Sequence, residues 1–331
     1  MIILGIAGFG HVGRIHREAA RHVSGVEVAA IATSRPDEAR RLSKPDVALF
    51  TNYSDLLRCA ELDAVIVCVP TYLHEQFVLE AVSQGLSVLC EKPFSLDLAS
   101  AQRMLDAVRR NQVCLMIAQV LRFWPLYVRV KQLVGDGAIG SVRAIAAYRL
   151  AKYPPWGEWF RDPEKSGGAL LDMQVHDTDF VYWLLGSPEG IYAAGIQSAT
   201  GSWDQVCTTL LYPHAVATME ATYLMPDVWP FTCGIRVSGS RGCLEYSFRV
   251  VGNVEQREQA NSSLLMYAND GTVTEPAVSK EDMYGVQLRY FVECAAHKQS
   301  PSLCPPEETL EVMRIMSACQ QSLSTRIPVR L

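Results

Sequence analysis

Residues 5–16 read GIAGFGHVGRIH, and this stretch decides the fold of the first part of the chain. Three glycines, at positions 8, 10 and 13, follow the apolar run 2–7 and open a helical pattern. In that context they permit a tight turn, a close approach of backbone to a pyrophosphate, and close helix–strand packing. The alternative is a glycine-rich turn without a ligand. The expected cofactor-binding residues of this loop are Gly8, Phe9, Gly10, His11, Val12 and Gly13.

The pattern on either side of the loop alternates apolar runs with helical stretches. The clearest helix is expected over residues 97–110, where Ser95 could cap the start. Near-continuous apolar strands between helices are typical of a parallel sheet covered on both faces. We therefore expect a doubly wound Rossmann domain over residues 1–120. Its further strands are expected at 26–32, 64–69, 86–90 and 113–120.

The hydrophobic pattern changes after residue 120: the predicted strands are longer, and apolar and polar residues alternate along them. The segment SGSRG at 238–242 has the composition of a hairpin turn. Residues 121–331 are therefore expected to form an α/β domain with a large, mostly antiparallel sheet. Its strands are expected at 142–150, 205–212, 214–223 and 234–248, and its helices at 126–134, 169–185, 285–299 and 307–324.

Composition limits the class of protein. The formal net charge of −5 over 331 residues argues against a nucleic-acid partner. No apolar run approaches the roughly 20 residues that span a bilayer, so no membrane partner is expected. The start MIILGIAGFG lacks the basic residues of a signal peptide, and the ten cysteines form no CxxC pair. We expect a cytoplasmic protein with reduced, mostly buried thiols.

The residues that follow the second strand indicate whether the dinucleotide is NAD or NADP. NAD-binding domains usually carry an acidic residue about 20 positions after the glycines. Here that count from Gly13 reaches Thr33, then Ser34 and Arg35. A carboxylate would repel a 2′-phosphate, whereas Ser34 and Arg35 could bind one. The sequence therefore favours NADP over NAD, and Asp37 is expected to begin the next helix.

The tripeptide Glu91-Lys92-Pro93 lies at the carboxyl end of an apolar strand. Ligands bind at that edge of open α/β sheets. Pro93 restricts the backbone of Lys92, whose ammonium group suits a hydroxyl or a developing alkoxide. Glu91, Lys92, Pro70 and His74 are also expected beside the cofactor. The alternative for Lys92 is an exposed loop residue, paired with Glu91 or with nothing.

Residues 170–180, LLDMQVHDTDF, carry Asp172, His176 and Asp179 at helical spacing. Histidine suits a general base because its ordinary pKa of about 6.5 lies near working pH. Asp172, one turn away, could orient the imidazole. The alternatives are a helix-terminal carboxylate with a satisfied partner, or a metal site, for which a third ligand is missing. We expect no metal and a structural Asp179.

Several of these motifs together resemble one family. The glycine loop, EKP, and GGALLDMQVHDTDFVYWLLG at 167–186 look like the glucose–fructose oxidoreductase, inositol dehydrogenase and rhizopine-catabolism (Gfo/Idh/MocA) family. The likeness runs over the whole length, through residues 70–108 and 134–145 to the closing RIPVRL. It implies a Rossmann domain, an α/β domain with an open sheet, and NAD(P)-dependent oxidation of sugar or polyol hydroxyls, or the reverse reduction.

By this resemblance Lys92 matches the family's catalytic lysine, and Asp172 and His176 match its acid/base pair. One departure is Gln174, where many members have glycine. We expect Gln174 to face away from Asp172 and His176.

Substrate contacts are expected from aromatic and arginine side chains, since aromatic faces pack on sugar C–H groups and arginine binds anions. The alternative for the tryptophans is packing of their own loop. His16, like His11, is expected on the surface of the first helix. The expected assembly is a homodimer or homotetramer, through an exposed apolar sheet face. The substrate-binding candidates are Arg122, Trp156, Trp159 and Arg161.

Two other functions remain open on the sequence. One is a dihydrodiol-type or biliverdin-type reductase on the same scaffold. The other is a non-catalytic regulatory protein that senses a dinucleotide. A sensor would be expected to have lost the lysine or the Asp/His pair, and Lys92, Asp172 and His176 are all present.

Overall fold

The computed structural model describes residues 1–42, 47–58, 61–250 and 261–331. These residues form two compact units. Unit 1 comprises residues 1–124 and 281–310, and unit 2 comprises 125–280 and 311–331. The sequence pattern predicts one second domain over all of 121–331, whereas residues 281–310 belong to unit 1.

Unit 1 is built on a six-stranded sheet in the order β3-β2-β1-β4-β5-β6. Every neighbouring pair is parallel. This is the usual order of a doubly wound dinucleotide-binding sheet, so the Rossmann prediction is confirmed. The three-residue strand β3 was not predicted. The strands are β1 (Ile2–Ala7), β2 (Val26–Ala32), β3 (Ala48–Phe50), β4 (Ala64–Val67), β5 (Ser87–Cys90) and β6 (Leu115–Ile117).

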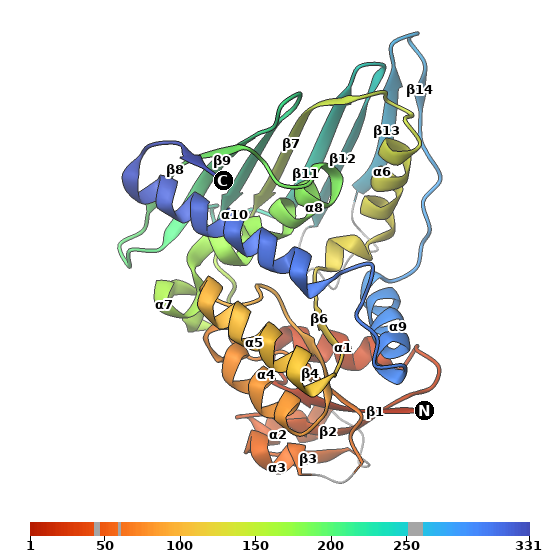
Figure 1. Ribbon diagram of the computed structural model, residues 1–331, viewed down its shortest axis with the longest axis vertical. Coiled ribbons are helices and arrows are strands. Elements are labelled where there is room, and N and C mark those ends of the chain that lie inside the picture. Colours follow the sequence, from red (N-terminus) through yellow and green to blue (C-terminus); the bar gives the residue numbers. More distant parts are fainter. Residues whose placement is uncertain (43–46, 59–60, 251–260) are drawn as a thin grey trace. The chain divides into compact units, whose positions relative to one another are not determined.

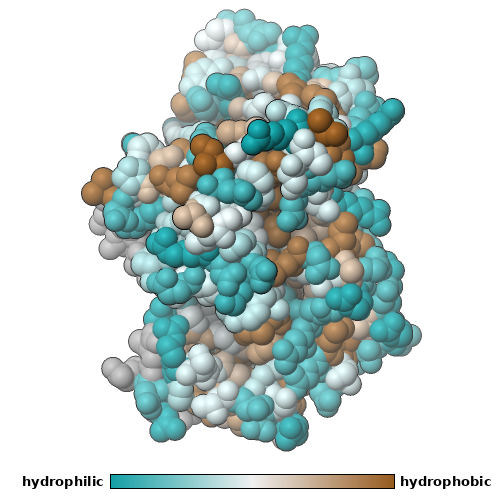
Figure 2. Space-filling model, turned by 90° about the vertical axis from the view of Figure 1, so that its left-hand side faces the viewer, coloured by the Kyte–Doolittle hydropathy of each residue, from teal (hydrophilic) through white to brown (hydrophobic). Residues whose placement is uncertain are grey.

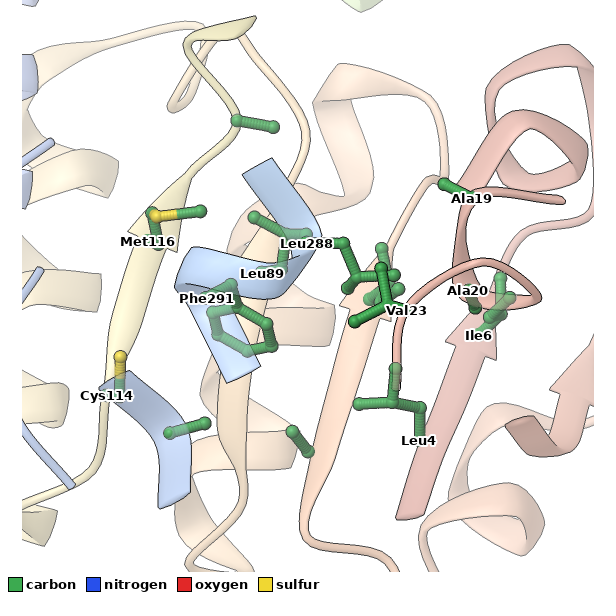
Figure 3. Packing of buried hydrophobic residues seen from close by; sticks show 14 of the residues in the cluster. Leu4, Ile6, Ala19, Ala20, Val23, Leu89, Cys114, Met116, Leu288 and Phe291 are labelled. Atoms are coloured by element: carbon green, nitrogen blue, oxygen red, sulfur yellow. The ribbon is translucent and has the colours of Figure 1, made fainter. Parts of the chain in front are cut away.

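Helices from distant parts of the sequence cover this sheet. Helix α9 (Met283–Ala296) brings Leu288 and Phe291 onto the same buried cluster as α1 (His11–Ala20), as Figure 3 shows. The cluster includes Leu4, Leu89 and Met116 of the sheet. The other helices of unit 1 are α2 (Pro36–Leu42), α3 (Tyr53–Leu57), η1 (Thr71–Leu73), α4 (His74–Ser83), α5 (Leu98–Asn111) and η2 (Val120–Arg122).

Helix α5 is capped by Asp97, and the prediction of Ser95 as the cap was wrong. Asp97 Oδ1 accepts the N–H of Ser100 at 2.8 Å. The Ser95 hydroxyl instead donates to the carbonyl oxygen of Asp97 at 2.6 Å. A carboxylate at the N-cap also favours the positive end of the helix.

Unit 2 contains a nine-stranded sheet in the order β14-β13-β12-β11-β7-β10-β9-β8-β15. Only the β7–β10 pair is parallel, so the prediction of a mostly antiparallel sheet is confirmed. The predicted strand 234–248 is a hairpin that turns between β11 and β12. The strands are β7 (Val142–Leu150), β8 (Gly190–Gln197), β9 (Trp203–Leu211), β10 (Val216–Thr222), β11 (Phe231–Gly239), β12 (Gly242–Val250), β13 (Asn261–Ala268), β14 (Val273–Thr274) and β15 (Val329–Arg330).

Helices α8 and α10 lie over one face of this sheet (Figure 1). In β9, Val206 and Leu210 face them and are buried, whereas Cys207 and Leu211 on the opposite face are exposed. The other helices are α6 (Pro125–Gly135), η3 (Glu158–Arg161), α7 (Pro163–Ser166), η4 (Leu170–Gln174), α8 (Val175–Leu185) and α10 (Pro306–Thr325).

None of the helices in the described parts of the chain is long and apolar enough to cross a membrane. Figure 2 shows one face of the protein, where hydrophobic side chains form separate small patches among hydrophilic ones. The nine described cysteines are free thiols, and six of them are buried. Cys59 lies outside the described residues.

Candidate active site

The glycine loop of unit 1 connects β1 to α1. Gly8 has φ +92°, and a Cβ there would lie 2.6 Å from the carbonyl oxygen of Cys68. A Cβ on Gly13 would lie 3.1 Å from the carbonyl carbon of Gly8 and closer still to its oxygen. Among the described residues, a Cβ on Gly10 would meet only Arg35 Nη2, at 4.0 Å. The chain's own packing thus requires Gly8 and Gly13, while Gly10 leaves the room that a phosphate needs above the loop.

The carboxyl end of β2 presents a cation to this loop. Ser34 and Arg35 are both exposed there, and no acidic residue lies between β2 and α2. Thr33 Oγ1 accepts the N–H of Arg35 at 3.1 Å, which fixes the backbone at this turn. The guanidinium beside Gly10 suits an anionic group more than a neutral ribose hydroxyl.

The Glu91-Lys92-Pro93 turn follows β5, and Lys92 is half-buried. The Lys92–Pro93 peptide is cis. Glu91 is buried, and its Oε2 accepts the N–H of Lys92 at 3.3 Å. Its Oε1 lies 2.7 Å from Nε2 of His16. The carboxylate therefore links the backbone of Lys92 to helix α1.

The prediction that His16 lies on the surface was wrong. Its side chain is fully buried, because His16 falls on the same inward face of α1 as Gly13 and Ala19. The ring also packs edge-on against Tyr284 of α9, with centroids 5.5 Å apart. Glu91 supplies the polar partner that a buried imidazole requires.

His74 supports the same turn from the other side. Its Nδ1 lies 2.9 Å from the carbonyl oxygen of Pro93, and its Nε2 lies 3.1 Å from that of Val69. Burial lowers the pKa of His74, although both carbonyls favour the protonated ring. His74 therefore joins the loop after β4, which includes Pro70, to the loop after β5.

Arg122 is enclosed by protein groups of unit 1. Its guanidinium is buried, forms an ion pair with Glu308, and donates to the carbonyl oxygen of Leu303 at 3.3 Å. Both partners belong to the returning segment 281–310. These contacts account for the burial of Arg122 without a substrate, and its role as a substrate residue stays a prediction.

In unit 2, Asp172 and His176 do not lie on one regular α-helix as predicted. Residues Leu170–Gln174 form a π-helical turn, η4, and the α-helix α8 begins at Val175. A π turn is wider than an α turn, so four-residue spacing across it does not stack side chains in one row. Asp172 is 8% exposed, His176 is half-buried and Asp179 is fully buried. π turns inside helices are frequent at functional sites.

Tyr223 was missed by sequence reasoning, and it is a direct partner of Asp172. Its hydroxyl donates to Asp172 Oδ2 from the chain just after β10. Gln174, the departure from the family pattern, is directed at the sheet: its Oε1 accepts the hydroxyl of Thr208 at 2.7 Å, and its Nε2 donates to the carbonyl oxygen of Met219 at 3.4 Å. No local pattern marks a lone tyrosine at a strand end as a site residue.

The three candidates of the 156–161 loop have different surroundings. Trp159 stacks on Phe160, with ring centroids 3.9 Å apart, and so packs its own loop. Trp156 is 42% exposed and meets Phe160 only edge-on at 6.5 Å. The Arg161 guanidinium lies 4.1 Å from the ring centre of Tyr153. Of the two tryptophans, Trp156 is the more exposed.

A buried ion pair fixes α8 to the sheet beside His176. Arg149 Nη2 donates to Asp177 Oδ1 at 2.9 Å, and Nε donates to Oδ2 at 3.2 Å. Both side chains are almost fully buried. Burial raises the pKa of Asp177, and the Arg149 charge opposes that shift.

Within the residues that the structure describes, no three His, Cys, Asp or Glu side chains gather into a metal site.

Comparison with known proteins places these two units in one family. Residues 2–119 match the model of an oxidoreductase family with an NAD-binding Rossmann fold, GFO_IDH_MocA. Residues 127–245 match the model of the GFO/IDH/MocA C-terminal domain. The chain belongs to the Gfo/Idh/MocA family. The N-terminal match includes the glycine loop and the EKP turn, and the C-terminal match includes Asp172 and His176.

Relatives in the Gfo/Idh/MocA family include sugar and inositol dehydrogenases. A D-xylose 1-dehydrogenase (NADP(+)) of Haloferax volcanii is 31% identical over 339 residues, covering 99% of this chain and 98% of its own. A myo-inositol 2-dehydrogenase of Thermotoga maritima is 31% identical over 196 residues, covering 58% of each chain. The crystal structure of an aldose-aldose oxidoreductase from Caulobacter crescentus has the same fold, with a TM-score of 0.86, 20% identity, and coverage of 100% of this chain and 99% of its own.

Proposed function

We propose that this family member is an NAD(P)-dependent dehydrogenase that acts on a hydroxyl-bearing carbon of a sugar, inositol or related polyol. One observation carries the proposal. Lys92, Asp172 and His176 all match the family's catalytic motifs, in a chain that is 31% identical over 339 residues to a D-xylose dehydrogenase. A protein that had kept only the dinucleotide fold would be expected to have lost part of this set.

The residues of the glycine loop fit the cofactor. Gly10 leaves open the space for a diphosphate, and α1 begins directly after it at His11. The N-terminus of a helix offers free N–H groups that bind phosphate. The bound nicotinamide would supply the hydride acceptor or donor. Arg35 beside Gly10 supports NADP as the preferred form, and the Haloferax volcanii relative carries NADP(+) in its name.

The chain's own residues would handle the proton and the developing charge. In the proposal, the Lys92 ammonium group donates a hydrogen bond to the reacting hydroxyl and stabilises its alkoxide character. The His176 imidazole takes the hydroxyl proton as general base. The Asp172 carboxylate orients the resulting imidazolium and balances its positive charge.

The test is a substrate panel, with NAD(P)H absorbance followed for both cofactors. The panel contains D-xylose, D-glucose and myo-inositol, with a trans-dihydrodiol and biliverdin for the alternative reductases. Lys92→Met and His176→Ala should bind NADPH normally and lose at least about a thousandfold in turnover. The matched controls are Lys280→Met and His22→Ala, which change exposed residues. Wild-type rates in both site variants would refute the assignment.

We also propose that the protein forms a homodimer or homotetramer through the open face of the unit 2 sheet. On that face Tyr192, Ile196 and Leu211 are 41%, 61% and 46% exposed, although they are large and apolar. A second copy would remove this area from water. Sedimentation velocity should find a dimer or larger species, and Ile196→Asp with Leu211→Asp should dissociate it. A monomeric wild type would contradict the proposal.

A further inference from the structure

Two tyrosines in unit 2 form a stacked pair, and each binds a different buried aspartate. The rings of Tyr153 and Tyr223 lie 5.2 Å apart with an interplanar angle of 19°. The Tyr223 hydroxyl donates to Asp172 Oδ2, and the Tyr153 hydroxyl donates to Asp204 Oδ2. The same chemical arrangement is therefore used twice, side by side, and only one copy includes a residue of the proposed acid/base pair.

The ends of three strands build this arrangement. Tyr153 follows β7, Tyr223 follows β10, and Asp204 lies at the start of β9. The N–H of Tyr223 donates to the carbonyl oxygen of Asp204 at 2.9 Å, which fixes the two strand ends together. The Arg161 guanidinium lies against the Tyr153 ring. The position of the Tyr223 hydroxyl is thus set by backbone and stacking contacts that do not involve Asp172.

The two tyrosines differ in their packing. Tyr223 is 2% exposed and packs in a cluster with Ala169 and Met173 of the segment that carries Asp172. Tyr153 is half-buried at the edge of that cluster, and burial together with the Asp204 hydrogen bond raises its pKa to about 12. It therefore keeps its proton at neutral pH and remains a donor.

We propose that Tyr223 is a positioning residue that fixes the carboxylate of Asp172 for its work with His176. This inference rests on the proposed function of the Asp172–His176 pair. An aspartate side chain has several staggered rotamers. One strong donor of fixed position selects a single rotamer. Partners that orient the ligands of a metal site typically contribute about 10- to 100-fold to affinity or activity, and we expect an effect of the same size for a carboxylate that works with an imidazole.

The chain offers a matched control. Tyr223→Phe and Tyr153→Phe each remove one hydroxyl from the same stacked pair and leave both rings in place. Each also leaves one buried aspartate without its tyrosine donor. A purely structural role predicts similar effects of the two variants on stability and on turnover. A positioning role predicts a loss of turnover in Tyr223→Phe alone.

The experiment uses the full chain and four measurements: thermal unfolding, NADPH affinity, kcat and KM with D-xylose or myo-inositol, and a crystal structure of each variant. Tyr223→Phe should lower kcat about 10- to 100-fold, with KM and NADPH affinity within about twofold of wild type. Tyr153→Phe should keep kcat within about threefold. The Asp172 carboxylate should change position only in the Tyr223→Phe crystal.

Three results would overturn the inference: equal losses of kcat in the two variants, no loss in Tyr223→Phe, or an unmoved Asp172 in its crystal. If the wild type oxidises neither D-xylose nor myo-inositol nor any other compound of the panel, the proposed function fails. In that case the crystal comparison still decides whether Tyr223 fixes the Asp172 carboxylate, because it locates Asp172 without substrate.

Discussion

Gly10→Ala and Gly13→Ala make the same chemical change three residues apart, and they should fail in different measurements. At Gly10 the new methyl group meets, within the described parts of the chain, only Arg35 Nη2 at 4.0 Å. The φ angle there is −78°, which alanine adopts freely. Alanine is a poorer N-cap than glycine by up to about 1 kcal/mol. It also reduces the freedom of the unfolded chain, which returns about 0.4–1 kcal/mol. The free energy of unfolding should therefore stay within about 0.5 kcal/mol of wild type.

The methyl group of Gly10→Ala stands where a diphosphate must approach the backbone. A lost hydrogen bond to a charged group costs about 1.5–3 kcal/mol. That range corresponds to a weakening of NADPH affinity by about 10- to 150-fold. The expected variant is as stable as wild type and binds the dinucleotide poorly.

For Gly13→Ala the balance is reversed. Alanine inside a helix gains about 1 kcal/mol over glycine. The new methyl group, however, would lie 3.1 Å from the Gly8 carbonyl carbon and closer still to its oxygen. Both are backbone atoms that cannot rotate away, so the cost lies near the upper end of about 1–3 kcal/mol for overpacking. A net loss of about 2 kcal/mol lowers Tm by about 4–8 °C for a unit of this size.

The assay is thermal unfolding without cofactor, combined with a fluorescence titration of NADPH for the same two variants. Gly13→Ala should show the lower Tm, and Gly10→Ala the normal Tm with weak binding. Gly10→Ala with wild-type affinity would mean that the open space above the loop is not the phosphate site. Gly13→Ala with wild-type stability would refute the packing argument.

Three further perturbations test separate contacts. Arg35→Ala should weaken NADPH binding at least about tenfold and NADH binding little, with exposed Arg40→Ala as control; equal losses for both cofactors would end the NADP preference. Asp177→Asn leaves the buried Arg149 without its carboxylate and should cost about 3–5 kcal/mol in urea unfolding; a loss below about 1 kcal/mol would contradict it. Burial lowers the pKa of His74, so this side chain binds a proton more readily in the unfolded chain than in the folded one. The contribution of His74 to folding stability is therefore fully present above about pH 6.5 and declines as the pH falls below that value. Tm of His74→Gln should accordingly depend less on pH than wild type between about pH 7.5 and 5.5, and parallel curves would show that His74 does not titrate in this way.

The parts of the fold that sequence predicted are those fixed by local pattern. β1, the glycine loop and α1 form one contiguous signal, and each step has a steric reason visible at Gly8 and Gly13. The alternation of apolar and polar residues predicted the antiparallel sheet, because burial alternates along its strands and one face of the sheet packs on helices. Contacts between segments far apart in the sequence have no comparable local sequence pattern. The two-residue strand β15 is defined only by its partner β8, and α9 joins unit 1 after 156 residues of unit 2.

The segment around Asp172 shows a different limit. A reading by period assumes 3.6 residues per turn throughout, and under that assumption Asp172, His176 and Asp179 share one side. The π turn at Leu170–Gln174 breaks the assumption without any glycine or proline inside it. The identities of the site residues could therefore be proposed from the motif. Their relative directions, and the Tyr223 hydroxyl that Asp172 accepts, depend on the sheet beneath them.

The support of Lys92 follows from strand order, which the sequence does not display. His16 lies on the helix after β1, Glu91 follows β5, and β4 lies between those strands in the sheet. When each residue is considered alone, glutamate is expected on the surface and histidine has no strong preference for the interior. Brought together, they satisfy each other and both can be buried. The motif is thus sufficient to find the lysine, whereas the group that holds its backbone becomes visible only when α1 and the turn after β5 are placed side by side. A change at His16, far from Lys92 in sequence, should therefore act on the lysine through Glu91.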